Sequence, residues 1–346
     1  MPMQTEADDM LVVSFERLMR EQHPITYART GHTLDDPKHY AKWELINEGG
    51  WLELVDFETE AGTHYALVLG EMMGRSLLNL PLVFSAYVLH PLCQMVPELV
   101  SAGIVLPLQA NPGVGRVDAL AEDEEGERFV DFHGRRACYY RLAPTDASKA
   151  TWRIQRYAGS EIDVMEGMDV CGSLGRLSTG RPAAEAEVSL PVAEMRTLLC
   201  RYLAVELAQT IGAAAAALDM AIGYAKERQQ FGKPIGQYQA VKHPLANAWV
   251  ALDNGRYAVR ALLGEEAVRD VASIAARIVI AAATQATKLA IQVHGGVGFA
   301  WEHDAHLFLK RVYHKRLEIQ RLARVLDPRL EKVDAPANTR DFAEQP

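Results

Sequence analysis

Three long, alanine-rich segments with few helix breakers place the strongest constraint on the fold of this chain. Apolar residues recur at helical spacing over residues 193–226, 238–264 and 266–294. Alanine has the highest helix propensity, and an amphipathic or wholly apolar helix of this length must bury its apolar face against other helices. These segments predict a C-terminal helical bundle, and the charged segment over residues 304–329 is also helical in composition.

The middle of the chain has a different sequence pattern. Short runs of β-branched and aromatic residues, separated by turn-forming residues, occupy the region from about residue 105 to 188, namely IVLPLQ, RFVDFHG, CYYRLA and TWRIQRYAG. Such runs are typical of strands. Residues 10–103 instead mix helical periodicity with glycine and proline breakers, which predicts several short helices.

The order helices, strands, helices predicts a mainly α protein with a small central β domain. The chain of 346 residues is long enough for two or three domains with buried cores. We place the limits at residues 1–104 for an N-terminal helical domain, 105–190 for the β domain, 191–330 for the bundle and 331–346 for a loose tail.

Composition excludes several classes of function. The chain has 36 basic and 45 acidic residues, and no basic stripe with interleaved aromatics, so we expect no nucleic-acid partner. The first ten residues, MPMQTEADDM, show no targeting segment, which predicts a cytoplasmic location. The most apolar stretch, residues 278–293, is interrupted by Lys288 and other polar residues, so we expect a buried bundle helix and no membrane span.

The polar run WEHDAH, Trp301 to His306, contains two histidines three residues apart, a spacing that can serve a metal ion on a helix. No further ligand pair recurs at metal spacing. A polar helix start with Asp304 near the positive end of the helix dipole is the preferred interpretation, and we predict no metal site.

The first motif, ERQQFGKPI at residues 227–235, combines a helix end with an anion-binding side chain. Arg228 offers a planar fork of donors that matches a pyrophosphate. Gly232 and Pro234 are expected to stop the helix, so that Arg228 and Gln230 project from its last turn. Alone, the motif could be a charged helix end followed by a turn.

The second motif, QVHGGVGF at residues 292–299, ends another predicted helix. Gly295 and Gly296 let the backbone come within contact distance of a bulky ligand, and Gln292 lies one helical turn before them. A Gly-Gly pair alone is most often a helix C-cap. Its spacing from Arg228 and the following Gly298-Phe299 favour a ligand site.

Together the two motifs and the element order resemble the acyl-CoA dehydrogenase family, a resemblance that covers nearly the whole chain and includes GEMMGRS at residues 70–76. The resemblance implies a barrel-like β domain, a four-helix C-terminal bundle, FAD as cofactor and an oligomer in which this arm contacts a neighbour's FAD. The FAD contacts that it implies are Arg228, Gln230, Phe231, Ile235, Tyr238, Gln292, Gly295 and Gly296. The stretch GFAWEHDAHLFLKR also resembles a short subgroup that acts on CoA thioesters of steroid side chains.

The family's reaction uses a carboxylate to remove the α-proton of an acyl-CoA while the flavin accepts a hydride. In one class this glutamate lies roughly 24 residues after the first motif glycine, where this chain has Ile319. In the other it lies roughly 26 residues before the motif arginine, where this chain has Tyr202. The expected base is therefore missing at both positions.

Two nearby carboxylates are candidates for the base. Glu318 could be brought into place by a one-residue gap, and Glu206 lies one turn beyond Tyr202 on the same helix face. The simpler interpretation makes Glu318 an outward partner of Lys315 or Arg321, and Glu206 a carboxylate at the bundle edge.

The β domain also departs from the family, because LQANPGVGR at residues 108–116 replaces its flavin-covering segment and offers no matching hydroxyl. The chain is therefore predicted to be a flavin-sharing, non-catalytic subunit of a heteromeric α2β2 acyl-CoA dehydrogenase, whose homologous partner supplies the glutamate. The predicted substrate is a steroid side-chain acyl-CoA. The alternatives are a self-sufficient homo-oligomeric dehydrogenase that uses Glu318 or Glu206, and a flavin-free scaffold subunit.

Overall fold

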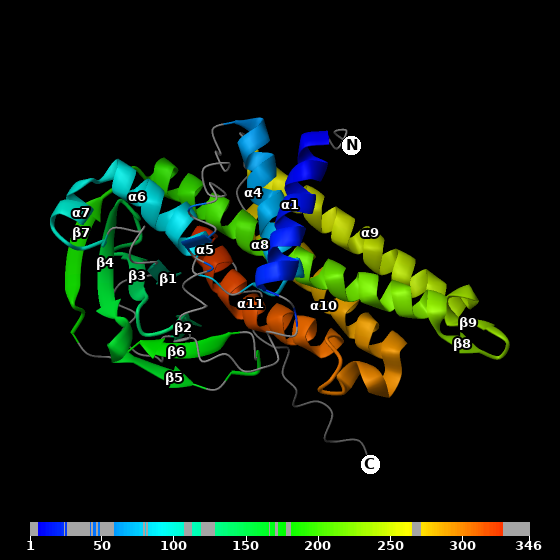
Figure 1. The fold of residues 1–346 in the computed structure, drawn as a ribbon. Helices are drawn as coiled ribbons and strands as arrows, with labels where there is room; N and C mark the ends of the chain where they lie inside the picture. Colours follow the sequence, from blue (N-terminus) through cyan, green and yellow to red (C-terminus); the bar gives the residue numbers. More distant parts are fainter. Residues whose placement is uncertain are drawn as a thin grey trace, which may run out of the picture.

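A computed structural model of the chain shows a helical bundle with a β domain at one end (Figure 1). The structure describes residues 6–23, 25, 42, 44, 45, 48, 59–78, 80, 82–106, 113–118, 129–165, 167–169, 172–177, 181–264 and 271–327.

The bundle is built around one long central helix. α8 (Val192–Glu227) packs against α9 (Gln239–Leu262), α10 (Val271–His294) and α11 (Ala305–Leu326), and its alanine-rich middle is buried. By length and composition alone, α8 and α10 could each cross a membrane, but 78% of the most apolar window of α8 is buried inside the protein, against 50% for α10. The core helix of a helical bundle has the same composition, and α8 is such a helix because its neighbours bury most of it.

Glycines bring an N-terminal helix against α8. In α4 (Glu60–Arg75), a Cβ added at Gly74 would lie 1.9 Å from the carbonyl oxygen of Gln209, and one at Gly212 of α8 would lie 1.9 Å from that of Glu71. Only residues without a side chain allow this approach. Shorter helices accompany α4 in the N-terminal region, namely α1 (Glu6–Gln22), α5 (Leu82–Phe84), α6 (His90–Met95), α7 (Glu98–Ser101) and the π-helical turn η1 (Ser85–Leu89).

The β domain contains two sheets in the described part of the chain. One has the strand order β1-β3-β4-β7, with β1 and β3 parallel, and the other has the order β2-β6-β5. The strands are β1 (Gly113–Val117), β2 (Phe129–Phe132), β3 (Cys138–Pro144), β4 (Thr151–Ala158), β5 (Ile162–Met165), β6 (Ser173–Leu177) and β7 (Ala184–Ser189). A 3-10 turn, η2 (Gly159–Glu161), joins β4 to β5.

The strand predictions are confirmed for RFVDFHG, CYYRLA and TWRIQRYAG. They are wrong for IVLPLQ where the structure describes it, because residues 104–106 form no strand. Sequence reasoning did not single out β7, whose alternating alanine and glutamate have low β propensity and which lies on the solvent side of β4.

The prediction of a mainly α fold with a small β domain is confirmed. The proposed domain limits stay a prediction, but the β domain and the hairpin of β8 (Gln229–Gln230) and β9 (Lys233–Pro234) lie at opposite ends of the bundle (Figure 1). This separation governs how the candidate site residues are distributed.

Candidate functional site

The first motif forms an exposed hairpin beyond the end of α8, which corrects the expectation that its side chains project from a helix. Arg228 is the C-cap of α8 with extended backbone, and Gln230 belongs to β8. The turn between β8 and β9 holds Phe231 and Gly232 at φ values of 51° and 80°. A tight hairpin turn of this kind needs positive φ at both central residues, so the chain leaves the helix before Gln230.

Local contacts hold this arm in shape. The Tyr238 hydroxyl donates to the Gln230 carbonyl oxygen at 3.1 Å, and the Lys233 ammonium lies 4.4 Å from the centre of the Tyr238 ring. Ile235, in the 3-10 turn η3 (Ile235–Gln237), packs against the alanine-rich core of the bundle. Phe231 is 94% exposed. An exposed aromatic ring held at positive φ is an energetically costly arrangement that a ligand or partner contact would explain.

The second motif meets the first at the same end of the bundle. The ring of Tyr224, in the last turn of α8, lies 4.6 Å from that of His294 at the end of α10, and His294 lies 4.3 Å from His303. Gly295 then adopts a φ of 64° and begins the 3-10 helix η4 (Gly295–Phe299). Tyr224, just before the first motif, thus contacts His294 of the second, and the shared ligand that the motif pair implies stays a prediction.

The donors at this end are open to solvent. Arg228, Gln230 and Gln292 are exposed, and Arg228 makes no ion pair with a described carboxylate. A Cβ added at Gly295 or Gly296 would meet nothing within 4 Å, so a large group can approach this backbone. A guanidinium, two amides, an open glycine backbone and an aromatic ring fit a phosphate-bearing dinucleotide such as FAD.

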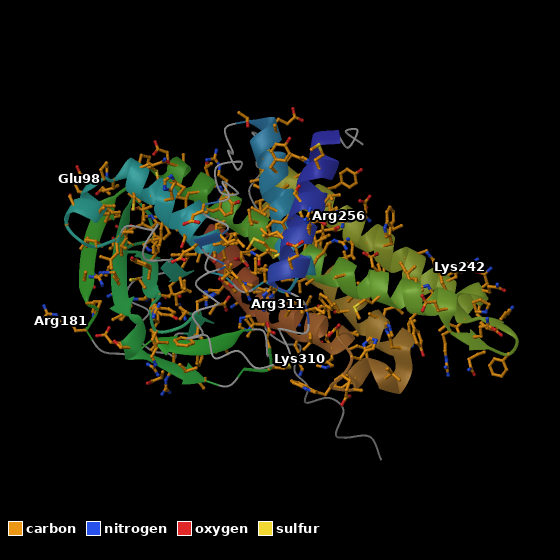
Figure 2. The ribbon with its side chains drawn as sticks, in the orientation of Figure 1. Glu98, Arg181, Lys242, Arg256, Lys310 and Arg311 are labelled. Atoms are coloured by element: carbon orange, nitrogen blue, oxygen red, sulfur yellow. The ribbon has the colours of Figure 1, made fainter. Side chains whose placement is uncertain are left out.

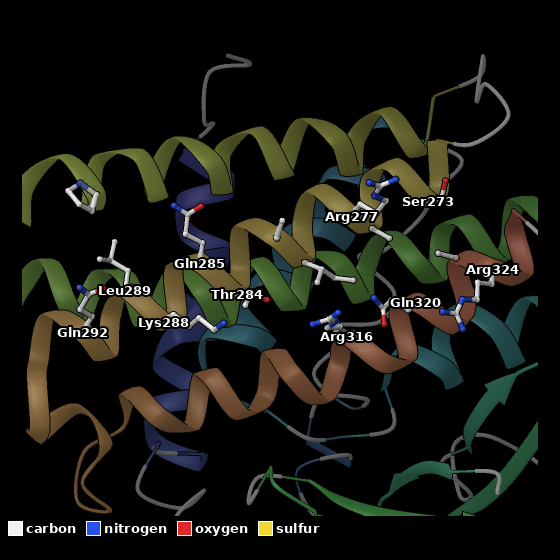
Figure 3. Close-up of a pocket in the computed structure, with 15 residues that line it drawn as sticks. Ser273, Arg277, Thr284, Gln285, Lys288, Leu289, Gln292, Arg316, Gln320 and Arg324 are labelled. Atoms are coloured by element: carbon white, nitrogen blue, oxygen red, sulfur yellow. The ribbon is translucent and has the colours of Figure 1, made fainter. Parts of the chain in front are cut away.

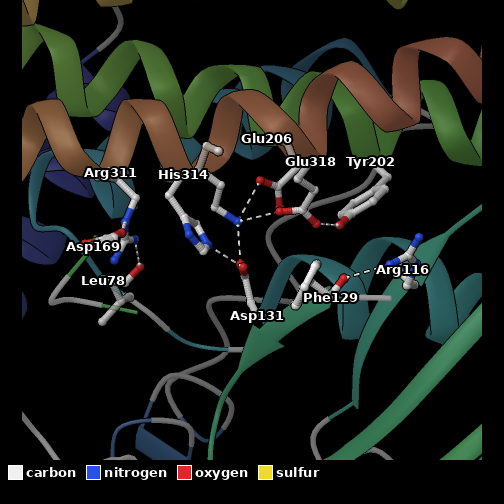
Figure 4. Close-up of polar contacts among 11 residues, drawn as sticks. Leu78, Arg116, Phe129, Asp131, Asp169, Tyr202, Glu206, Arg311, His314 and Glu318 are labelled. Atoms are coloured by element: carbon white, nitrogen blue, oxygen red, sulfur yellow. Dashed lines mark hydrogen bonds and ion pairs between the residues drawn. The ribbon is translucent and has the colours of Figure 1, made fainter. Parts of the chain in front are cut away.

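The candidate bases lie in a different place, in a buried ionic cluster between the bundle and the β domain (Figure 4). Lys315 of α11 lies 3.0 Å from Asp131 of β2, 3.1 Å from Glu206 of α8 and 3.1 Å from Glu318 of α11. The Tyr202 hydroxyl donates to Glu318 at 2.7 Å. His314 completes the cluster at 2.5 Å from Asp131.

Both candidate bases are therefore turned inward. Glu206 is only 3% exposed, so its predicted place at the bundle edge is wrong. Glu318 pairs with Lys315, as expected, but points into the protein rather than outward. The residues that sequence reasoning missed are Asp131 and His314, because β2 and α11 meet only in the folded chain.

The charges of this cluster shift its pKa values in opposite directions. Burial raises the pKa of Glu206 to about 7; Lys315 opposes this shift, whereas Glu318 and Asp131 add to it. The Lys315 contact with Glu206 Oε2 lacks hydrogen-bond geometry, so this oxygen has an ion partner but no hydrogen-bond donor. Burial alone would raise the pKa of Asp131, yet Lys315 and His314 hold it well below its usual range.

The pKa values of Lys315, His314 and Tyr202 are all raised. Burial lowers the pKa of Lys315, but Asp131, Glu206 and Glu318 outweigh it and raise that pKa well above the ordinary value. The pKa of His314 is raised because its pairing with Asp131 outweighs burial. Burial, then Glu318 and Glu206, raise the pKa of Tyr202. Lys315 is thus a fixed positive charge among three carboxylates.

Among the residues that the structure describes, this cleft leaves no room for a substrate. The space between the side chains around Lys315 is about 30 Å³, the share of one water molecule, whereas small-molecule sites have about 300–1,000 Å³. The Phe84 ring fills the cleft on the β1 side, 2.0 Å from where a Cβ at Gly115 would lie and 5.7 Å from the Tyr202 ring. The segment that replaces the family's flavin cover, residues 108–116, is described only from Gly113.

Three further ion pairs with little solvent exposure lie in the same region. Arg311 of α11 contacts Asp169 at 2.5 Å and donates to the Leu78 carbonyl oxygen at 3.4 Å (Figure 4). Asp118 lies between two arginines, Arg116 at 2.5 Å and Arg141 at 2.6 Å. Arg116 therefore forms an ion pair inside the β domain.

At the WEHDAH segment, the Nδ1 atom of His303 accepts a hydrogen bond from the Ala305 N–H at 3.1 Å, and His306 stacks on Trp301. Among the described residues, no group of three histidine, cysteine or acidic side chains is placed to hold a metal ion. The expectation that the chain has no metal site stays a prediction.

The chain is similar in sequence and in fold to known proteins. The sequence model of the family described as acyl-CoA dehydrogenase, C-terminal domain, matches residues 203–317. The acyl-CoA dehydrogenase FadE34 of Mycobacterium tuberculosis is 40% identical over 181 residues, which are 50% of this chain and 24% of that protein. The chain spans about a third or less of the length of the curated relatives that it matches first.

Solved structures share the fold over nearly the whole chain. The ChsE4-ChsE5 complex from Mycobacterium tuberculosis matches with a TM-score of 0.70 at 20% identity, covering 99% of this chain and 98% of the matched chain. The Tcur3481-Tcur3483 steroid ACAD matches with a TM-score of 0.63 at 18% identity, covering 92% and 98%. At these identities the likeness concerns the fold.

Proposed function

This chain belongs to the acyl-CoA dehydrogenase family, and on that premise we propose that it is a flavin-sharing, non-catalytic subunit of a heteromeric acyl-CoA dehydrogenase. A homologous partner subunit supplies the catalytic glutamate. The assembly introduces an α,β double bond into a CoA thioester.

The observation that carries this proposal is the closed cleft around Lys315. Both carboxylates near the family's base positions, Glu206 and Glu318, contact the same ammonium group, and the cleft holds about 30 Å³ of space. A general base must reach the α-proton of a bound substrate within hydrogen-bonding distance. Neither carboxylate can do so while an acyl chain has no room beside it.

The arm supports a role toward another chain. The stretch of α8 between Glu206 and Arg228 is about 33 Å long, at about 1.5 Å per residue. Arg228 therefore lies far from the cleft of its own chain. We infer that Arg228, Gln230, Phe231, Gln292 and the backbone of Gly295 and Gly296 hold the adenosine and pyrophosphate part of an FAD whose flavin ring faces the partner's cleft.

When bound in this assembly, FAD would supply the hydride acceptor of the reaction. The residues of this chain bind the cofactor and place it: the Arg228 guanidinium neutralises a phosphate, and the aromatic ring of Phe231 covers an apolar face. Ile235 and Tyr238 keep the hairpin in its orientation through the contacts of the arm.

For the substrate, we propose a steroid side-chain acyl-CoA, and for the assembly an α2β2 heterotetramer in the cytoplasm. The fold is shared with a steroid acyl-CoA dehydrogenase and with a complex of two different subunits. The stretch GFAWEHDAHLFLKR, which resembles this subgroup, begins at the arm end of the bundle, where His303 contacts His294 and His306 stacks on Trp301.

The test is to purify the chain alone and after co-expression with a homologous acyl-CoA dehydrogenase that retains its glutamate, and to record the visible absorption spectrum. We expect flavin only in the complex. Arg228→Ala should weaken FAD binding roughly 10- to 150-fold, because a hydrogen bond to a charged group is worth about 1.5–3 kcal/mol. Arg181→Ala, on the β-domain side (Figure 2), is the matched control.

Turnover of the complex should survive Glu206→Gln and Glu318→Gln. Flavin and turnover in the chain alone, abolished by either substitution, would instead establish the self-sufficient enzyme. A complex whose flavin content is unchanged by Arg228→Ala would establish the flavin-free scaffold.

A further inference from the structure

The bundle face formed by α10 and α11 is strongly basic in an acidic protein. These two helices carry eight lysines and arginines and a single acidic residue, Glu318. The chain as a whole has 36 basic and 45 acidic residues. Arg311 and Lys315 turn inward to the ion pairs described above, which leaves other cations of the two helices on the surface.

Four of these cations line one groove (Figure 3). The groove has a volume of about 700 Å³ and runs along α10 and α11, with Pro244 of α9 at its border. Its cations are Arg277, Lys288, Arg316 and Arg324, and the other polar residues that line it are Ser273, Thr284, Gln285, Gln292 and Gln320. None of the lining residues is acidic, and none of the four cations forms an ion pair with a carboxylate in the described parts of the chain.

Exposed apolar side chains lie on the same helices. Ile274 and Ile278 of α10 are 53% and 39% exposed, and Leu317 of α11 is 70% exposed. α10 is apolar enough to pass for a membrane span, yet half of its most apolar window is uncovered. A surface that mixes uncovered aliphatic side chains with unpaired cations is typical of a protein interface.

We propose that this α10–α11 groove is the surface where the chain pairs with its homologous subunit, and that its charge selects a partner whose corresponding face is acidic. This inference rests on the proposed heteromeric function. It adds a physical reason for heteromeric assembly, because a two-fold symmetric contact of the chain with itself would place the four cations against four identical ones.

Like charges placed opposite each other in an interface are costly, whereas an acidic face would pair with them. The groove is also continuous with the flavin-holding arm. Gln292 lines the groove at one end and lies one turn before Gly295. A partner seated in the groove is therefore held next to the residues that we assign to the shared FAD.

A charge-reversed copy of this chain provides the acidic partner for the test. Arg277→Glu, Arg316→Glu and Arg324→Glu are combined in one variant; all three arginines are exposed, so the fold tolerates the change. Wild type and variant are examined alone and mixed by native mass spectrometry, which separates the two masses. We expect a one-to-one mixed dimer that neither protein forms with itself.

Salt sharpens the test. Raising the ionic strength from about 0.1 M to about 1 M shortens the Debye length from about 10 Å to about 3 Å. The mixed dimer should weaken at least about tenfold over this range. The matched control is the triple variant Arg135→Glu, Arg136→Glu and Arg181→Glu, which makes the same charge change on the β domain and should form no mixed dimer.

Three results would overturn the proposal. The first is a wild-type dimer through this face at low salt, or the absence of a mixed dimer. The second is binding of ADP or inorganic pyrophosphate to wild type but not to the groove variant, which would assign the groove to a small anion. The third is faster hydrogen exchange of α10 after deletion of residues 328–346, which would show that the chain's own C-terminal segment covers it.

Folding of the groove variant is checked separately by its circular dichroism and its urea midpoint. Flavin is not read in these experiments. If the charge-swap test fails, the proposed flavin-sharing function is not affected. If the complex contains no flavin, the mixed dimer still decides whether the groove is an interface.

Discussion

The two ends of the bundle differ in the burial and the pairing of their charged groups. At the arm end, Arg228 is exposed and makes no ion pair with a described carboxylate, and Phe231 is 94% exposed at positive φ. At the β-domain end, Lys315 contacts three carboxylates and the remaining space is about 30 Å³. The arm end is open, and its Arg228 has no ion-pair partner among the described residues, whereas the carboxylates of the β-domain end are paired with Lys315.

Under the proposed function, this difference means that a family site is retained in one half and lost in the other. The donors for a phosphate-bearing ligand need only a hairpin, a helix end and a glycine turn, all of which are local. A catalytic base needs space and a carboxylate free of a fixed cation. Filling the cleft with Phe84 and Lys315 removes both conditions without disturbing the arm.

The largest effect is expected from Lys315→Met. The substitution leaves Asp131, Glu206 and Glu318 buried together without their shared cation, and breaking a buried ion pair costs about 3–5 kcal/mol. The free energy of unfolding, measured with urea, should fall by that amount near pH 8 and by less at pH 5, where carboxylates can take up protons. Lys310→Met, on the same helix, should change it by less than about 1 kcal/mol. If both variants lost the same free energy of unfolding, the buried cluster would not distinguish the β-domain end from the rest of the bundle.

The next effect is the pH dependence of Glu206→Gln. The folded-state pKa of Glu206 is about 7, above its ordinary 4.5, so its contribution to stability is full below pH 4.5 and is lost as the pH rises through 7. Glutamine cannot ionise. The unfolding free energy of the variant should therefore gain on wild type between pH 5 and pH 8, by an amount on the order of 2–3 kcal/mol.

The folded-state pKa of His314 is also raised, so its contribution to stability is likewise lost as the pH rises. This loss occurs in wild type and in the variant alike, so the difference between the two proteins reports on Glu206. Glu187→Gln, at an exposed ion pair with Arg153, is the control and should show no such slope. If the difference in unfolding free energy between Glu206→Gln and wild type is constant with pH, Glu206 is ionised over the whole range. It would then be a carboxylate able to act as a base, and not a buried acid.

The arm end was largely predictable from sequence because its information is local. Arg228, Gly232 and the Gly295-Gly296 pair are short-range signals, and the structure joins the two motifs through Tyr224 and His294. The conformation was not predictable in detail. The sequence suggested a helix end for Gln230, whereas the positive φ at both Phe231 and Gly232 makes a hairpin.

The cleft end could be predicted only in part, because its contacts join distant segments. Asp131 and Lys315 are 184 positions apart, and nothing in the strand FVDF marks an ion-pair partner. Spacing did find Glu206 and Glu318 as the nearest carboxylates to the family positions. It could not show that α8 is buried on every side from Tyr202 to Ala215, which turns Glu206 inward rather than to the bundle edge.

A smaller effect is expected from Tyr202→Phe. The substitution removes the 2.7 Å hydrogen bond to Glu318 but keeps the ring against Phe84, so the cost is that of one bond to a charged group, about 1.5 kcal/mol. Urea unfolding measures it. Tyr257→Phe, at an exposed position, is the control. Turnover of the complex should be unchanged in both variants, and a loss confined to Tyr202→Phe would place this cleft in the reaction after all.

The smallest effect on stability, and the sharpest contrast between the two ends, is expected at Phe231. Replacing it by glycine relieves the cost of positive φ, about 1 kcal/mol, and adds the backbone entropy of glycine, about 0.5–1 kcal/mol, so the free energy of unfolding should stay nearly constant. Flavin binding to the complex should still weaken severalfold, because the exposed ring is removed from the cofactor. Phe231→Tyr keeps the ring and should retain the flavin. Because every substitution at the closed cleft changes stability while this one leaves it intact, a flavin content unaffected by Phe231→Gly would show that the exposed ring serves something other than the shared cofactor.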